Sequence, residues 1–527
     1  MKTFLTLIFA CFLFLFSNGQ NVNISEGNVF DGEPYIAVNP QNPEHMVVAW
    51  MGWVPYYIAI KTRVSFDGGQ TWGNTSYISH TGLADQSADP SMAFDNSGNV
   101  FLSYVDYNKA LDTGFVYVRK SVDGGLSWGA PVEVINASSD GEHRPIDRPW
   151  MSIDSSGGIY DGNIYVTTMP PNIFGPLPPP YHPYFIRSVD GGVSFEPFRY
   201  LDTVNWLAGS YVPQPMPVNC ISSDGIFYAV YPSYVYSQNP LGQFIIASSE
   251  DGGNSFAYNT VFSLSESLSN TLVKTGYLLR SDPSNADHLA FFYLGISYGD
   301  YDVLMRESYD KGITWSDAVR LNDDPVGNNK IQDLLWADFD NNGNLVVSWR
   351  DRRNGTDTTY TTASEIWGTF RRKDSLNFSQ NFRISDTIVP YDTVLASSGN
   401  DFMCIKLVND TLNAVWGDTR DGTLNIWFER KAVGGTVLFT GQLGSEDVPQ
   451  IEICPNPFTS EIIIKGSTIK QVKIYNQKGQ LILLQKKQYQ SNLLKIEASE
   501  LLSGVYYVEI ITAEGIVIRK IIKTQKN

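Results

Sequence analysis

The sequence predicts an all-β protein: a seven-bladed β-propeller, with six blades as the alternative, followed by a small Ig-like β-sandwich. Three observations lead to this prediction. A short turn motif recurs five times along the chain, strand–turn–strand segments recur between its copies, and the last 77 of the 527 residues differ in composition and charge. A fixed repeat length is the signature of a fold assembled from similar units.

The repeated motif has the form Ser-x-Asp-x-Gly-x-[Thr/Ser]-[Trp/Phe]. Its acidic residues are 56, 67, 61 and 59 positions apart: Asp67, Asp123, Asp190, Asp251 and Asp310. In a tight turn such an Asp accepts hydrogen bonds from the backbone, and the Gly allows a positive φ. The terminal aromatic ring is suited to burial between neighbouring units. We therefore expect these five Asp residues to be structural rather than catalytic.

This motif is the Asp-box, or BNR repeat, and the chain resembles the sialidase-like Asp-box β-propellers. Between the boxes an apolar strand, a turn and a second apolar strand recur seven times, starting at residues 33, 89, 148, 217, 276, 333 and 401. Four strands per unit and about 61 residues per unit predict a propeller over residues 22–445. Six blades is the alternative if one unit is a decoration, because sialidases have six.

The two ends of the chain carry export features. Residues 1–20 read as a signal peptide, with Lys2 followed by the apolar run Phe4–Phe16, which is too short to span a bilayer. Residues 451–527 alternate short strands and turns, which predicts a small β-sandwich. No other segment reaches membrane-spanning length, so we expect a protein without a transmembrane segment.

The sequence motifs of the C-terminal segment are more specific than its predicted fold. It reads CPNPFTSEIIIKG, VKIYNQKGQLI and LLSGVYYVEI, and it ends with Arg519, Lys520 and Lys523. In these features it resembles the type A sorting domain of the type IX secretion system. The resemblance implies a Bacteroidetes-type bacterium, the type IX machinery as a partner, and a secreted or outer-surface location.

Composition restricts the partners and cofactors. The net charge of −17 argues against nucleic acid and against polyanions in general. The three cysteines beyond the signal peptide are far apart and lack metal-ligand spacing. We expect no cofactor and no metal; Ca²⁺ remains open as an alternative, although no acidic turn shows a full ligand set.

Strand direction predicts where the chemistry lies. With strands numbered 1 to 4 from the axis outward, the Asp-box is the 3–4 turn. The 2–3 loops and the 4–1 crossovers then share the opposite face, which we call the crossover face, and there we expect a binding site. Three charged segments fall on it: EHRPIDRPW, WRDRRNGTD and WGDTRDG.

From these segments we predict catalytic acids and ligand-binding residues. The predicted catalytic residues are Asp147, Asp351 and Asp357. The planar guanidinium group can bind two oxygens at once, and the predicted substrate-binding residues are Arg144, Arg148, Trp150, Arg350, Arg353 and Arg420. The pattern Trp-x-Asp-x-Arg-x-Gly occurs twice, at 349–355 and 416–422. Its repetition also suits a structural role in which each Asp holds the Arg of its own loop.

The resemblance to sialidases implies an exo-sialidase-like glycoside hydrolase acting on extracellular glycans or glycoproteins. The Arg-Ile-Pro of active sialidases is absent, however, because the matching strand reads EPYIAV. Their acidic-x-Arg pattern has a loose match at Asp351–Arg353, and their Glu–Tyr pair cannot be placed. Two alternatives therefore stay open: a non-catalytic propeller that binds glycans or proteins, and a propeller polysaccharide lyase with a base such as His143.

Overall fold

The computed structural model describes residues 21–524 except 28, 83, 111–112, 171–181, 203–216, 234–240, 264–275, 391–399, 434–450, 477–480 and 513–515. The predicted signal peptide, residues 1–20, lies outside the described residues. The chain divides into two compact units, residues 1–433 and 434–527. The all-β prediction is confirmed: the described residues form 33 strands and one short 3-10 helix, η1 (Gly141–His143).

The first unit consists of four-stranded antiparallel sheets that follow one another along the chain. The first two are β2 (Asp31–Asn39), β3 (Asn42–Val54), β4 (Tyr57–Ser65) and β5 (Ser76–Tyr77), then β6 (Gln86–Phe94), β7 (Val100–Tyr107), β8 (Gly114–Ser121) and β9 (Val132–Asn136). One parallel bridge between Ile58 and Gln86 joins these two into a larger sheet.

The next four sheets repeat the same strand order. The third sheet contains β10 (Asp147–Ile153), β11 (Ile164–Met169), β12 (Tyr184–Ser188) and β13 (Arg199–Tyr200), and the fourth contains β14 (Val218–Ile221), β15 (Phe227–Ser233), β16 (Gln243–Ser249) and β17 (Ala257–Ser263). The fifth contains β18 (Tyr277–Asp282), β19 (Asn285–Gly295), β20 (Asp302–Ser308) and β21 (Val319–Arg320). The sixth contains β22 (Gln332–Phe339), β23 (Leu345–Asp351), β24 (Glu365–Arg371) and β25 (Phe382–Arg383).

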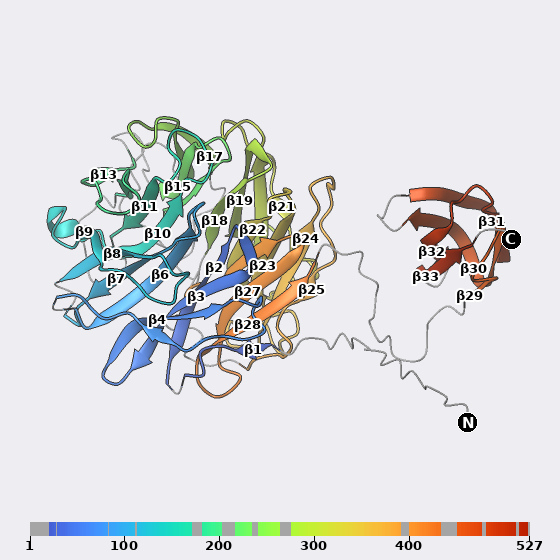
Figure 1. Cartoon of the computed structure of the whole chain (residues 1–527), viewed down its shortest axis with the longest axis horizontal. Coiled ribbons are helices and arrows are strands. Elements are labelled where there is room, and N and C mark those ends of the chain that lie inside the picture. The colour runs from blue at the N-terminus through green and yellow to red at the C-terminus, as the bar shows by residue number, and fades with distance from the viewer. Residues whose placement is uncertain are drawn as a thin grey trace, which may run out of the picture. The chain divides into compact units, whose positions relative to one another are not determined.

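The last sheet closes the ring. It contains β26 (Cys404–Val408), β27 (Thr411–Asp418) and β28 (Asn425–Ala432), and its outer strand is β1 (Val22–Asn23) from the start of the unit. The first strands contact one another in the order β2, β6, β10, β14, β18, β22 and β26, and β26 contacts β2 again. Figure 1 shows β2, β6, β10, β18 and β22 toward the middle, with β9, β13 and β25 at the rim. The unit is therefore a β-propeller, and we call its four-stranded sheets blades 1 to 7 in chain order.

The five Ser-x-Asp motifs form the turns between the third and fourth strands of blades 1 to 5. In the first, Ser65 Oγ donates to Asp67 Oδ1 at 2.8 Å, and the Thr71 backbone N–H donates to the same oxygen at 2.9 Å. The same pair of bonds recurs at Asp123, Asp190, Asp251 and Asp310. Hydrogen bonds to the carboxylate lower the pKa of the first four Asp residues to about 2.

The glycine two residues after the Asp of each motif lets the turn pack against the preceding blade. Gly253 has φ +87°, and a Cβ placed there would lie 2.3 Å from the ring of Phe185 in blade 3. Phe256 at the end of this motif packs edge-on against Phe185, with ring centroids 5.1 Å apart. The motif therefore ties neighbouring blades together.

The second unit contains one five-stranded antiparallel sheet in its described residues. The strands are β29 (Ile451–Cys454), β30 (Glu461–Asn476), β31 (Leu481–Glu497), β32 (Gly504–Thr512) and β33 (Ile516–Lys523). The long β30 pairs with β29, β31 and β32. Alternate residues such as Ile462, Ile464, Val472 and Ile474 are buried in its core. The Ig-like arrangement expected for this segment stays a prediction.

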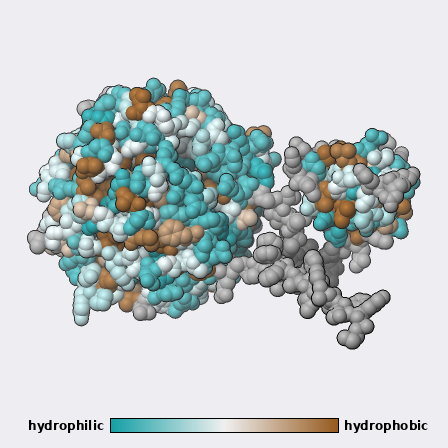
Figure 2. Space-filling view, in the orientation of Figure 1, coloured by the Kyte–Doolittle hydropathy of each residue, from teal (hydrophilic) through white to brown (hydrophobic). Residues whose placement is uncertain are grey.

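The visible surface of the first unit is largely polar. On the face of the first unit seen in Figure 2, most of the surface is hydrophilic and the apolar patches are small and separate. Within the described parts of the chain, no helix has the length and apolar character needed to cross a membrane.

Candidate active site at the propeller axis

Four innermost strands carry the same irregularity where they begin. The pairing register of β2, β6, β10 and β22 shifts at a bulge that contains a residue with positive φ: Glu33 (54°), Asp89 (55°), Arg148 (46°) and Leu334 (51°). Positive φ is unfavourable for residues other than Gly, and bulges re-aim side chains at functional sites. In three of the four the next residue is proline: Pro34, Pro90 and Pro149.

These bulges bring acids from three neighbouring blades together at the crossover face. The Glu33 and Asp147 carboxyls each lie within hydrogen-bonding reach of Asp89. Asp89 therefore interacts with both of the other carboxyls. Glu33 is buried, with 3 % of its surface exposed, whereas Asp89 and Asp147 are partly exposed. The acids are thus surrounded by protein and still reachable from solvent.

The surroundings give the three acids different charge states. Burial raises the pKa of Glu33 well above its usual value, and the Asp89 and Asp401 carboxylates raise it further. Burial and the Asp89 charge likewise raise the pKa of Asp147. Burial also raises the pKa of Asp89, but Arg148 and the hydrogen bond from Glu33 oppose this shift. Like charges in contact cannot all ionise, so the cluster favours an ionised Asp89 between neutral Glu33 and Asp147.

Arg148 and Asp401 complete this axial cluster. Arg148 Nη2 lies 2.7 Å from Asp401 Oδ2, and the two side chains are 13 % and 15 % exposed. The neighbouring carboxylates, Asp401 first among them, raise the pKa of Arg148, so its charge is permanent. Asp401 precedes β26 of blade 7, so residues from blades 1, 2, 3 and 7 meet here.

Tyr107, at the end of β7, lies beside the same acids. Its hydroxyl pKa is raised by burial first and then by the charges of Asp89, Glu33 and Asp147. Tyr107 is partly buried, and the charges that act on it are those of the axial cluster. The crossover face therefore offers one hydroxyl, three adjacent carboxyls and one guanidinium group at the axis.

Aromatic side chains pack beneath the axial cluster. Trp150, predicted to bind substrate, is 7 % exposed, and its ring centroid is 5.4 Å from both Trp336 and Phe402 and 5.9 Å from Tyr35. This packing places Trp150 in the propeller core below Arg148 rather than on a binding surface.

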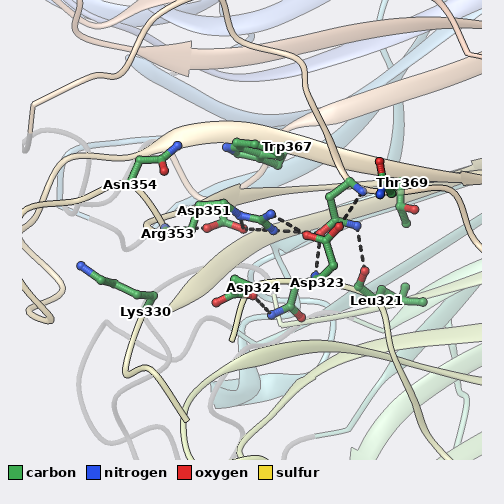
Figure 3. A network of polar contacts seen from close by, with 12 residues as sticks. Leu321, Asp323, Asp324, Lys330, Asp351, Arg353, Asn354, Trp367 and Thr369 are labelled. Atoms are coloured by element: carbon green, nitrogen blue, oxygen red, sulfur yellow. Dashed lines mark hydrogen bonds and ion pairs between the residues drawn. The ribbon is translucent and has the colours of Figure 1, made fainter. Parts of the chain in front are cut away.

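The predicted site at Asp351 and Arg353 is a network of polar contacts centred on blade 6 (Figure 3). Asp351 Oδ2 accepts from Trp349 Nε1 at 2.7 Å and from Arg353 Nη2 at 2.9 Å, while Oδ1 accepts from the Arg353 backbone. The Arg353 guanidinium also pairs with Asp323 at 2.6 Å and stacks 4.2 Å from the Trp367 ring. Both Asp351 oxygens are occupied, so this geometry gives no support to a catalytic role.

Blade 7 repeats this network. Trp416 Nε1 donates to Asp418 Oδ2 at 2.8 Å, and Arg420 Nη2 lies 2.6 Å from the same oxygen. The Arg420 guanidinium pairs with Asp386 and stacks 4.1 Å from the Trp427 ring. The same set of contacts in two blades favours the structural interpretation of the Trp-x-Asp-x-Arg motif.

The remaining predicted residues are Arg350, Asp357 and Arg144. Arg350 and Arg352 are 4 % and 3 % exposed, and both pair with the buried Asp333, at 2.5 Å and 3.2 Å. Asp357 accepts hydrogen bonds from the Thr359 backbone and hydroxyl at 2.8 and 2.6 Å. Arg144 follows η1 with φ 47° and is partly exposed. Of the nine predicted site residues, Asp147 and Arg148 therefore form part of the cluster at the axis.

Sequence reasoning missed Glu33, Asp89, Asp401 and Tyr107. A signal for two of them was present: the first strands of units 1 to 3 begin Glu-Pro, Asp-Pro and Arg-Pro. A charged residue before proline at the same place in three successive repeats is unusual for an apolar inner strand. No comparable pattern precedes Asp401, which has Phe402 after it.

Comparison with known proteins identifies the C-terminal segment. Residues 452–524 match the family described as the secretion system C-terminal sorting domain. The protein is therefore secreted or held at the cell surface. No curated protein matches the sequence.

Several solved structures resemble the chain at low identity. A protein of unknown function from Dyadobacter fermentans is 15 % identical, with 63 % of this chain and 93 % of that chain covered and a TM-score of 0.42. An alpha-L-arabinanase from Penicillium chrysogenum is 12 % identical, with 78 % and 98 % covered and a TM-score of 0.41. The endosialidase of phage phi92 is 10 % identical, with 97 % and 89 % covered and a TM-score of 0.44.

Proposed function

We propose that this protein is an extracellular glycoside hydrolase whose reaction takes place at the axial cluster. The observation that supports the proposal is the set of three adjacent carboxyls, Glu33, Asp89 and Asp147, which the strand bulges of blades 1 to 3 bring together beside Arg148. Groups with strongly shifted pKa values that meet on the loop face of a scaffold are candidates for acid–base work. The secreted or cell-surface location places extracellular glycans within reach.

We assign the roles from charge state and exposure. Asp147 is partly exposed and neutral, so it is the proton donor to the leaving oxygen. Asp89 is the carboxylate that takes a proton back, and the buried Glu33 holds it in place by hydrogen bonding. Retaining glycosidases separate their two carboxyls by about 5 Å, whereas these share hydrogen bonds. We therefore assign the nucleophile to Tyr107, because tyrosine can serve as the nucleophile in sialidases. As the Tyr107 oxygen bonds to the anomeric carbon, its proton passes to Asp89, and the leaving oxygen takes the proton of Asp147. Water then releases the sugar: Asp147 takes a proton from the water, and Asp89 returns its proton to the Tyr107 oxygen.

A non-catalytic glycan-binding propeller is the second candidate, and exposed tyrosines on the crossover face favour it. A lyase is less well supported, since it needs a base beside Arg without paired acids. The axial Arg148 instead lies among Asp147, Asp89 and Asp401.

The test is incubation of the full chain with a glycan panel, with release of reducing ends, free sialic acid and unsaturated uronates measured. The activity found should fall at least about 100-fold in kcat in Asp89→Asn and in Asp147→Asn, the usual weight of a general acid or base. Asp374→Asn, an exposed acid in the turn after β24, is the matched control. Silence with every glycan would favour the binder, and full activity in both variants would remove the axial acids from the reaction.

A further inference from the structure

The β3–β4 hairpin of blade 1 presents an unusual tyrosine at its tip. Pro55 and Tyr56 form the turn, and Tyr56 has φ 81° with 84 % of its surface exposed. This is the third position of a type II turn, where glycine is the usual residue. A bulky side chain there costs conformational energy, and in return the turn holds a large ring out into solvent on the crossover face.

Strand pairing sorts the neighbouring aromatic residues onto opposite faces of this hairpin. Tyr57 pairs with Val54, and Trp53 pairs with Ile58. Directly paired residues share a face and successive residues alternate, so Tyr57 and Trp53 face opposite ways. Their exposed fractions are nearly equal, 40 % for Tyr57 and 42 % for Trp53.

The Tyr57 face continues toward blade 2. The Tyr57 ring lies 4.9 Å from the ring of His80, whose Nε2 lies 2.8 Å from the Ile58 carbonyl oxygen. Lys109 Nζ donates to the Tyr56 carbonyl at 3.2 Å, and the Lys109 backbone N–H donates to Asp85 Oδ1 at 3.0 Å. The hairpin tip is thus fixed against two loops of blade 2.

The same loops lead back to the axial cluster. The Asp85 backbone N–H donates to the Tyr107 carbonyl at 3.0 Å, and Tyr107 pairs with Gln86, three positions before Asp89 on β6. A continuous line of residues therefore runs from Tyr56 through Lys109, Asp85 and Tyr107 to the acids.

We propose that Tyr56 and Tyr57 form a sugar-stacking subsite, so that the substrate is a glycan chain of several units rather than one terminal sugar. This inference rests on the proposed function, because it extends the axial site. Aromatic faces accept the apolar C–H face of a sugar ring, while a few placed polar groups bind hydroxyls. Lys109 and Asp85 carry opposite charges close to the hairpin tip, so the subsite suits neutral sugar units.

The test is native electrophoresis of the full chain through gels that contain arabinan, xylan, mixed-linkage glucan or colominic acid. We expect at least one neutral polysaccharide to retard the wild-type protein. The double variant Tyr56→Ala/Tyr57→Ala should lose about tenfold in affinity, and Trp53→Ala, on the opposite face of the same hairpin, less than twofold. Urea midpoints of all variants show whether the hairpin still folds.

The outcomes separate the two proposals. If no neutral polysaccharide retards the wild type, or if the Tyr double variant and Trp53→Ala bind equally, the subsite is overturned. If immobilised outer-surface proteins retain the wild type and no glycan retards it, the tyrosines bind an apolar protein partner. That result also overturns the sugar-stacking subsite. Asp89→Asn should bind as well as the wild type and lose turnover; if it keeps turnover, the axial site fails while the subsite stands.

Discussion

Replacement of Asp333 by Asn tests whether the arginines of the WRDRR segment are structural. Asp333 is 2 % exposed, and its carboxylate accepts from Arg350 Nε at 2.7 Å, from Arg352 Nη1 at 3.2 Å and from the Tyr360 hydroxyl at 2.9 Å. Asn is nearly isosteric but neutral, so two buried guanidinium groups lose their counter-ion. Removal of one partner of a buried ion pair costs about 3–5 kcal/mol.

The assay is urea unfolding of the full chain, followed by tryptophan fluorescence because Trp336 and Trp349 are buried in the same blade. We expect a loss of stability of about 3–5 kcal/mol in Asp333→Asn. Asp357→Asn, on the loop between β23 and β24, should change stability by less than about 0.5 kcal/mol, because its carboxylate is exposed. Equal stability of the two variants would refute the structural assignment of Arg350.

The pH dependence of this cluster has a definite sign. The two arginines hold the pKa of Asp333 well below its usual value, although burial opposes them. A lowered folded-state pKa gives stability that is present above the unfolded pKa and lost as the pH falls through the folded value. The Asp333 contribution should therefore persist at pH 5 and disappear in strong acid.

Three other predictions follow from the described contacts. His288 Nδ1 lies 2.9 Å from Asp282 and Nε2 lies 2.8 Å from Glu307, and these bonds raise the pKa of His288 against the effect of burial. The stabilisation by His288 should therefore be full below pH 6.5 and fade as the pH rises through the folded-state pKa. His288→Gln should flatten the dependence of the melting temperature on pH between pH 6 and 9. Gly253→Ala should lower the free energy of unfolding by about 2–4 kcal/mol, because of the positive φ and the contact with Phe185. Gly191→Ala has the same strain but meets no atom within 4 Å, so it should lower it by about 1 kcal/mol. Equal urea midpoints of the two variants would contradict this difference. Arg353→Lys and Arg420→Lys should each lower the free energy of unfolding by about 1 kcal/mol, since lysine keeps the charge but loses the stacking on Trp367 and Trp427. A urea midpoint equal to that of the wild type in either variant would contradict the structural role of that arginine.

Much of the fold could be predicted because the repeated residues are the ones that form a tight turn. The Asp-box fixes a tight turn through its own Ser, Asp and Gly, so five copies reveal five similar hairpins and the face opposite them. The closing strand β1 could not be predicted, because two residues, Val22 and Asn23, carry no recognisable strand pattern. Its place in the last blade depends on pairing with β28, about 400 positions away.

The candidate site was predicted in part. Asp147 and Arg148 stood out because their segment is charged and is not repeated in the other blades. Arg350, Arg353 and Arg420 were predicted for the same charge, but each has its acid in the same motif or on the preceding strand, so the pairs are satisfied locally. Glu33 and Asp401 are about 370 positions apart in the chain, and ring closure alone brings them to Arg148.

The most direct test of the central claim is the protonation state of the axial acids. Infrared spectra of the full chain, recorded from pH 5 to 8, report protonated carboxyl groups by their C=O band. We expect the wild type to keep such a band at pH 7, and Asp147→Asn and Glu33→Gln each to lose part of it. A wild-type spectrum without protonated carboxyl groups at pH 7, or a band that both variants leave unchanged, would contradict the account.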